Sequence, residues 1–230
     1  MQKPRDLAPF IDHSCLRPEA TPTDVQKLCE EALEYKFRAV SVNSAFVIQC
    51  SRLLKKSPVS ILVSVGFPLG ACTTDVKIYE CKRAVEDGAH EVEVVMSIGQ
   101  LRGSHYTVVE RELDGVVRVA NGAPVRVIVE ACLLTKEELV LACKLAKNAG
   151  ASGVQTSTGF SGGTATIEHV RMIRNTVGAV LGVKASGGIR TFNDAESFLQ
   201  AGASSLGTSS GPRIITCHEH GPGSDKELRN

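Results

Sequence analysis

The stretch VRVIVEACLLTKEELVLACKLAKNAGASGVQT, residues 125–156, contains the unit that repeats through the chain. It opens with β-branched residues at 125–130, a composition typical of a strand. Thr135-Lys136-Glu137-Glu138 has the pattern of a capping box, and apolar residues then recur at helical spacing over 139–146. Gly150 is placed to end this helix, and a second apolar run follows it. The stretch therefore predicts a strand, a crossover helix and the next strand.

Runs of the same kind recur along the chain, roughly 20 to 35 residues apart from the second onward, which suits one strand plus one crossover helix. The eight predicted strands are Phe10–Asp12, Ala39–Asn43, Ser60–Gly66, Glu91–Met96, Val125–Glu130, Gly153–Thr156, Leu181–Ala185 and Ser204–Gly207. Their nearly continuous apolar character indicates a parallel sheet that is buried on both faces. We therefore predict an α/β fold, a single (β/α)8 TIM barrel. No Gly-x-Gly-x-x-Gly follows the first strand to favour a dinucleotide-binding fold.

The barrel is predicted over residues 1–211, because the strand and helix periodicity stops near Gly211. Residues 212–230 are rich in Gly, Pro and charge, and we interpret them as a flexible C-terminal tail. Cys217-His218-Glu219-His220 in this tail resembles a set of metal ligands, but no second ligand pair lies near it in the sequence. No metal site is therefore expected.

The composition gives no sign of a strongly charged partner. The 26 basic and 25 acidic side chains leave a formal charge of +1, which argues against binding to nucleic acid or to anionic membranes. No apolar run approaches the roughly 20 residues of a membrane helix, and the charged N-terminus is not followed by the apolar core of a signal peptide. The eight cysteines are dispersed without a Cys-x-x-Cys pair, which favours reduced thiols. We therefore expect a soluble, cytoplasmic protein.

Polar side chains stand near the carboxyl ends of several predicted strands, where barrels of this kind place their reactive groups. Asp12 ends the first strand, Glu93 lies in the fourth and Glu130 ends the fifth. Gln155 lies in the sixth strand, and Lys184 lies near the end of the seventh. The sequence therefore predicts that polar side chains gather at the carboxyl ends of the strands of a largely apolar barrel.

Three segments late in the chain are rich in small polar residues, at 156–159, 185–190 and 207–211. Backbone N–H groups in such loops, followed by helix starts, form a concave cradle for an anion, and the last strands of a barrel often carry a phosphate site. The alternative is that these are ordinary turn glycines and serines. The candidate binding residues are Thr158, Gly159, Gly187, Gly188, Arg190, Gly207, Ser209 and Ser210. For Arg190, an ion pair at the surface is an equally good interpretation.

Five motifs occur in order: Ile11-Asp12-His13, Gly66-Phe67-Pro68-Leu69-Gly70, Thr156-Ser157-Thr158-Gly159-Phe160, Val183-Lys184-Ala185-Ser186-Gly187-Gly188-Ile189-Arg190 and Gly207-Thr208-Ser209-Ser210. Together they resemble the deoxyribose-phosphate aldolases, over about residues 6 to 211. The resemblance implies a (β/α)8 lyase that reversibly cleaves 2-deoxy-D-ribose 5-phosphate to glyceraldehyde 3-phosphate and acetaldehyde. It further implies a lysine imine (Schiff base) as the intermediate, no metal or organic cofactor, a small phosphorylated sugar as ligand and a homo-oligomeric assembly.

Two positions depart from the pattern of this family. The family has its imine-forming lysine directly before Thr-Ser-Thr-Gly, where this chain has Gln155, whose amide nitrogen is not basic. Its fourth-strand aspartate is replaced by Glu93, and a shift of about 1 Å in a catalytic group can cost around a hundredfold in rate. The family's second lysine is present as Lys184 and its first-strand acid as Asp12. Asp12 would contact sugar hydroxyls or ordered water, or else serve as a cap or form an ion pair at the barrel rim. The candidate catalytic positions are thus Lys184, Glu93, Gln155 and Asp12.

Three explanations for Gln155 remain open: a natural loss of the nucleophile, an engineered substitution, or a change that leaves Lys184 as the nucleophile. Without a second cation beside it, Lys184 is expected to be a fixed cation and a poor nucleophile. Two functions therefore compete. The first is an aldolase whose imine-forming activity is lost or strongly reduced. The second is a non-catalytic phosphosugar-binding or protein-interaction module, a pseudoenzyme that keeps the anion cradle.

Overall fold

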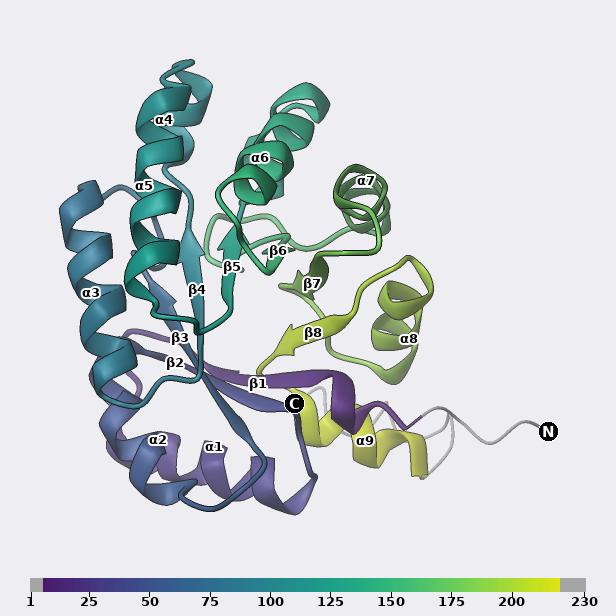
Figure 1. The fold of residues 1–230 in the computed structure, drawn as a ribbon. Coiled ribbons are helices and arrows are strands. Elements are labelled where there is room, and N and C mark those ends of the chain that lie inside the picture. Colours follow the sequence, from purple (N-terminus) through teal and green to yellow (C-terminus); the bar gives the residue numbers. More distant parts are fainter. Residues whose placement is uncertain (1–5, 220–230) are drawn as a thin grey trace.

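Residues 6–219 are described by the computed structural model, and their side chains are described as far as residue 216. Eight parallel strands close into a barrel in chain order, and β8 pairs with β1 (Figure 1). The strands are β1 Ile11–Cys15, β2 Ala39–Asn43, β3 Ser60–Val65, β4 Glu91–Val95, β5 Val125–Ile128, β6 Gly153–Gln155, β7 Gly182–Ser186 and β8 Ser205–Thr208. The predicted (β/α)8 barrel is confirmed, and each predicted strand overlaps an observed one.

Helices surround the barrel (Figure 1). They are α1 Pro22–Glu34, α2 Val47–Leu53, α3 Thr74–Glu86, α4 Ile98–Arg102, α5 Tyr106–Val119, α6 Lys136–Asn148, α7 Ile167–Val177, α8 Phe192–Gln200 and α9 Gly211–Glu219. Short 3-10 turns lie at η1 Ala8–Phe10, η2 Ser44–Phe46 and η3 Ala131–Leu133. Because the helical segments between strands return the chain to the opposite end of the barrel, consecutive strands run parallel.

The stretch at 125–156 has the predicted structure, β5 followed by α6 and β6. The Thr135 hydroxyl accepts a hydrogen bond from the Glu138 N–H at 3.2 Å, and the Glu138 carboxylate accepts one from the Thr135 N–H at 2.8 Å. Thr21 forms the same reciprocal cap at the start of α1. Beyond the end of α6, Gly150 has a φ of 80°, a left-handed conformation that glycine adopts without strain. Local sequence signals therefore define both ends of α6.

The two faces of the strands differ in chemistry. Val63 and Val92 belong to the layer of buried apolar side chains that the strands share with the helices. Asp12, Glu93 and Lys184 are also buried, but they meet inside the barrel. Since alternate residues of a strand point to opposite faces, charged residues at alternate positions are carried to the barrel axis. Both faces are buried, as predicted, yet the inner face holds charges.

The chain beyond Gly211 differs from the predicted flexible tail over part of its length. Residues Gly211–Glu219 form α9, which packs against α8 and β1 and buries Ile214. Pro212 lies in the first turn, where the missing N–H of proline costs no hydrogen bond. Residues 220–230 and the side chains of 217–219 lie outside the described residues, and with them the Cys-His-Glu-His cluster.

Three further findings concern metals, membranes and thiols. Within the described side chains, no group of three or more His, Cys, Asp and Glu residues is arranged to hold a metal ion. None of the helices over residues 6–219 is long and apolar enough to cross a membrane. The cysteines described, from Cys15 to Cys143, are all free thiols.

Candidate active site

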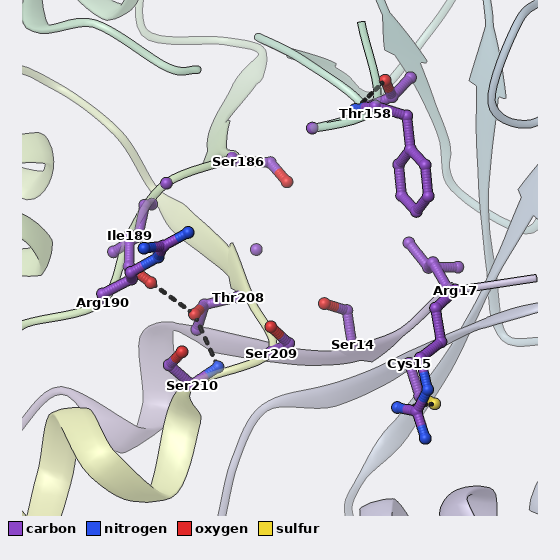
Figure 2. Close-up of a pocket in the computed structure, with 16 residues that line it drawn as sticks. Ser14, Cys15, Arg17, Thr158, Ser186, Ile189, Arg190, Thr208, Ser209 and Ser210 are labelled. Carbon is purple, nitrogen blue, oxygen red and sulfur yellow. Dashed lines mark hydrogen bonds between the residues drawn. The ribbon is translucent and has the colours of Figure 1, made fainter. Parts of the chain in front are cut away.

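A cavity of about 280 Å³ opens at the carboxyl ends of β6, β7, β8 and β1 (Figure 2). Four segments line it: Ser14–Arg17, Thr158–Phe160, Ser186–Arg190 and Gly207–Ser210. All eight residues predicted to form the anion cradle are among them. The structure therefore gathers the three predicted loops around one space and adds the segment Ser14–Arg17 to them.

Hydroxyl groups from different strands point into this cavity. Figure 2 shows the side-chain oxygens of Ser14, Ser186 and Ser209 directed toward its centre. Thr208 fixes the adjacent wall, since its hydroxyl donates to the carbonyl of Ile189 at 2.7 Å and accepts from a backbone N–H two residues later at 2.9 Å. The lining thus offers hydrogen-bond donors and acceptors that suit a hydroxylated or anionic ligand.

Two arginines stand on opposite sides of the cavity (Figure 2). Arg17 forms ion pairs with Asp24 at 2.6 Å and with Glu19 at 3.4 Å. Arg190 is exposed, and among the described side chains its guanidinium forms no ion pair. The charge of Arg190 is therefore available to an anion, whereas that of Arg17 is already balanced.

Gly207 shapes the floor of the cavity. A Cβ atom at this position would lie 2.7 Å from Lys184 Cε and 2.7 Å from Ser186 Oγ, closer than side-chain atoms pack. Because glycine has no side chain, the Lys184 side chain can pack directly against the backbone of Gly207, at the bottom of the cavity. Lys184 itself is buried and does not line the cavity.

Lys184 is held by two carboxylates from distant strands. Its Nζ lies 2.6 Å from Glu93 Oε1 on β4 and 2.9 Å from Asp12 Oδ2 on β1. The contact with Glu93 is a hydrogen bond, whereas that with Asp12 is an ion pair without hydrogen-bond geometry. The structure therefore brings three of the predicted catalytic residues together, and Asp12 forms its ion pair inside the barrel, where it is buried, and not at the rim.

The ion pairs continue into a closed ring of six residues inside the barrel. Arg126 Nη1 lies 2.8 Å from Glu93 Oε1, and Arg126 Nη2 lies 3.8 Å from Glu91 Oε2. Arg38 Nη1 lies 2.7 Å from Glu91 Oε1, and Arg38 Nε lies 2.6 Å from Asp12 Oδ1. With the lysine described above, three cations alternate with three anions. The charges of the ring therefore cancel, which limits the cost of burying them.

The ring controls the charge of Asp12. Burial by itself would raise the pKa of this carboxyl, because burial disfavours a charged group. The Lys184 and Arg38 cations outweigh burial and lower the pKa of Asp12 to about 2. Burial would likewise lower the pKa of Arg38, but the Asp12 and Glu91 carboxylates raise it above its ordinary value. Asp12 is thus an anion at neutral pH.

Gln155 lies beside Lys184 on the neighbouring strand, since the two Cα atoms are register partners of β6 and β7. Its Nε2 donates to the carbonyl of Ser157 at 2.9 Å, and its buried Oε1 has no hydrogen-bond partner among the described residues. Imine formation requires an amine nucleophile, which an amide cannot supply. The position next to Lys184 therefore lacks the lysine amine that the family resemblance implies there.

Several residues of this region were not predicted as site residues, among them three charged residues of the ring and two residues at the end of β1 and after it. Arg38, Glu91 and Arg126 complete the ring, and Ser14 and Arg17 line the cavity. Charges at alternate positions of apolar strands could have indicated Glu91 and Arg126. The position of Ser14 and Arg17 at the carboxyl end of the first strand and in the loop after it could have indicated the other pair.

Residues 8–215 match the family described as DeoC/LacD family aldolase. The chain is similar to the deoxyribose-phosphate aldolase of Thermococcus gammatolerans, with 50% identity over 214 residues, covering 91% of this chain and 95% of that one. The corresponding protein of Streptococcus sanguinis is 49% identical over 213 residues, covering 93% and 97%. A solved structure described as a unique tetrameric deoxyribose phosphate aldolase, from Aeropyrum pernix, matches with a TM-score of 0.88 at 36% identity, covering 94% of this chain and 92% of that chain.

Proposed function

The chain belongs to the DeoC/LacD family of aldolases, and on this basis we propose that it binds a small phosphorylated sugar of the 2-deoxyribose 5-phosphate class. We propose further that its imine-dependent carbon–carbon cleavage is absent or strongly reduced. The proposal rests on one observation: Gln155 occupies the position beside Lys184, and Lys184 Nζ is engaged by two carboxylates. The relatives whose names are deoxyribose-phosphate aldolase support the choice of ligand.

Class I aldol cleavage begins with attack of an unprotonated amine on the ligand's carbonyl carbon. Lys184 is poorly placed for this attack, because its Nζ contacts Glu93 and Asp12 while Ser186 and Gly207 separate it from the cavity. The charge of this ammonium group is balanced by the two carboxylates, so Lys184 offers the ligand neither a free amine nor an unpaired cation. The arrangement thus favours binding over covalent catalysis.

The phosphate group of such a ligand would fit the side of the cavity next to α8 and α9. Segment 187–190 precedes α8, and Ser210 precedes the first residue of α9. The N-terminus of a helix carries partial positive charge, which stabilises a phosphate. At α8 the N–H groups of Arg190 and Thr191 already donate to Asp194, at 3.2 Å and 3.0 Å. Arg190 adds a full charge with no ion-pair partner among the described side chains. These features support phosphate binding at this side and leave Ser14 and Ser186 for sugar hydroxyls.

The decisive experiment combines binding with chemical trapping. The protein is incubated with 2-deoxyribose 5-phosphate and borohydride, which reduces an imine to a stable secondary amine, and its intact mass is measured beside an active aldolase. Calorimetry measures the dissociation constant in parallel. Binding without an adduct is the expected result. An adduct that maps to Lys184 would establish a relocated nucleophile instead, and absence of both binding and adduct would favour a protein-interaction role.

We also infer a homo-oligomer in a reducing, cytoplasmic compartment. The tetrameric relative from Aeropyrum pernix supports the first inference. The reducing compartment is supported by the free cysteines. Cys29 and Cys50, for example, lie with their sulfurs 3.8 Å apart in a thiol–thiol hydrogen bond and form no disulfide. Light scattering that gives the mass of one chain would contradict the oligomer. Secretion of the protein from its host cell would contradict the compartment.

A further inference from the structure

Glu130 has an uncommon backbone conformation at the carboxyl end of β5. Its φ of 46° and ψ of 60° lie in the left-handed region, which residues other than glycine seldom occupy. The chain on both sides remains paired with β6, because Val129 N–H donates to the Gln155 carbonyl at 3.1 Å and Ala131 N–H donates to that of Thr156 at 2.8 Å. Glu130 is thus fixed from both sides at a strained position, which is where functional residues tend to occur.

The buried carboxylate of Glu130 accepts hydrogen bonds mainly from one loop, and Cys132 Sγ makes a further contact with Oε1 at 3.7 Å. The backbone N–H of Thr158 lies 3.2 Å from each carboxylate oxygen. The Thr158 hydroxyl also donates to Oε2, and the Ser161 hydroxyl donates to the same oxygen at 3.1 Å. Among the described residues no Lys, Arg or His forms an ion pair with Glu130. Its acceptor capacity is therefore directed to the loop between β6 and α7.

This loop forms one wall of the cavity. Thr158, Gly159 and Phe160 line the space, and the Phe160 N–H donates to the Thr158 hydroxyl oxygen at 3.1 Å. The Phe160 ring packs edge-to-face on Phe67, with ring centroids 5.2 Å apart. Glu130 does not line the cavity, but it holds the residue from which this wall extends.

We propose that Glu130 is a positioning residue that fixes the Thr158–Phe160 wall and thereby sets the affinity for the phosphorylated ligand. The proposal deepens the proposed function and rests on it. A carboxylate is required because the groups around it are donors, so two acceptor oxygens are needed. Glutamine at this position would put an NH2 group in place of one carboxylate oxygen, so one of the two contacts with the Thr158 N–H would set a donor against a donor.

The test compares Glu130→Gln with Glu112→Gln. Glu112 is a control for the loss of a buried carboxylate away from the cavity, because it accepts from the Ser97 N–H at 3.1 Å and the Ser97 hydroxyl at 2.6 Å. Glu112 also forms a buried ion pair with Lys77 at 2.8 Å, so its replacement should disturb the core at least as much as that of Glu130. Calorimetry measures the affinity for 2-deoxyribose 5-phosphate, and hydrogen exchange measures the protection of amides over residues 156–161. We expect Glu130→Gln to weaken binding at least tenfold and to speed exchange in this loop selectively. The affinity of Glu112→Gln should stay within twofold of that of the parent protein. Glu130→Asp should bind more tightly than Glu130→Gln and less tightly than the parent protein.

Three results would overturn the proposal. The first is an affinity of Glu130→Gln within twofold of the parent protein. The second is exchange that accelerates equally across the barrel in both variants, which would indicate general destabilisation. The third is unchanged exchange over 156–161. If the parent protein binds no sugar phosphate, the proposed function fails. Exchange in the two variants then decides separately whether Glu130 fixes this wall.

Discussion

The ammonium nitrogen of Lys184 lies 2.6 Å from Oε1 of Glu93, although the two residues are 91 positions apart in the chain. The same oxygen lies 2.8 Å from Arg126 Nη1. Glutamate is longer than the aspartate that the resemblance implies here, and the added length brings one oxygen into contact with two cations. The acid is thereby tied to the ring of ion pairs beneath the cavity.

Removal of the central cation should destabilise the fold. Lys184→Met would leave Asp12 and Glu93 buried without the charge that they share, so the free energy of unfolding should fall by about 3–5 kcal/mol. Urea denaturation measures the change. The control is Lys136→Met, because Lys136 forms an exposed ion pair with Glu168 at 2.6 Å and should contribute only about 0–1 kcal/mol. Equal, small losses in both variants would contradict a stabilising role for the ring.

The ring also predicts a dependence of stability on pH. The folded-state pKa of Asp12 is lowered to about 2, below the unfolded value of about 3.9. A lowered folded pKa stabilises the protein above the unfolded pKa, and this contribution is lost as the pH falls through about 4 to 2. The loss should be on the order of 2 kcal/mol. Urea denaturation between pH 2 and 6 should therefore show a steeper fall for the parent protein than for Asp12→Asn, and parallel curves would refute the assignment.

The order of strands and helices could be predicted because its signals are local. The capping box at Thr135 occurs where it was expected, as does the glycine after α6 at position 150. Helix α9 was not predicted, because the strand and helix periodicity stops near Gly211 and the segment after it is rich in Gly, Pro and charge. Proline in the first turn starts a helix as readily as it ends one, and only packing of Ile214 decides between the two.

The cradle residues could be predicted from their loops, whereas Asp12, Glu93 and Lys184, which meet across the barrel, were predicted with the help of the family resemblance. The cradle residues at 187–190 and 207–210 follow consecutive strands, so their approach follows from the topology. Arg38 and Arg126 pair with acids on other strands, and nothing near them in the sequence indicates those partners. Such contacts form only between side chains that reach the barrel axis at the same height. Which side chains do so is decided by the way the strands close into the barrel.

Ser209 offers a direct test of the anion cradle. Its hydroxyl points into the cavity, so Ser209→Asp would place a negative charge against the phosphate (Figure 2). We expect the affinity for 2-deoxyribose 5-phosphate to fall by more than about tenfold, which corresponds to about 1.4 kcal/mol. Ser209→Ala is the control and should cost less. Unchanged affinity of Ser209→Asp, measured by calorimetry, would place the phosphate elsewhere.

Gly188→Asp is a less informative substitution at the same site. Gly188 has a φ of 80°, and a Cβ atom there would lie 2.9 Å from Thr164 Cγ2. The variant would strain the loop whatever its charge, so a loss of binding could not be attributed to repulsion.

The last prediction concerns recovery of imine chemistry. Gln155→Lys would place an amine beside Lys184, and burial together with the neighbouring cation should lower the pKa of the introduced lysine. We expect borohydride trapping with 2-deoxyribose 5-phosphate to add one reduced ligand at position 155. Turnover should be slow with Glu93 in place. Gln155→Lys combined with Glu93→Asp should be faster by about tenfold to a hundredfold, if the carboxylate position limits the rate. Gln155→Met, which fills similar space without an amine, should give no adduct. A folded Gln155→Lys variant that binds the ligand and forms no adduct would show that the site has lost more than its nucleophile.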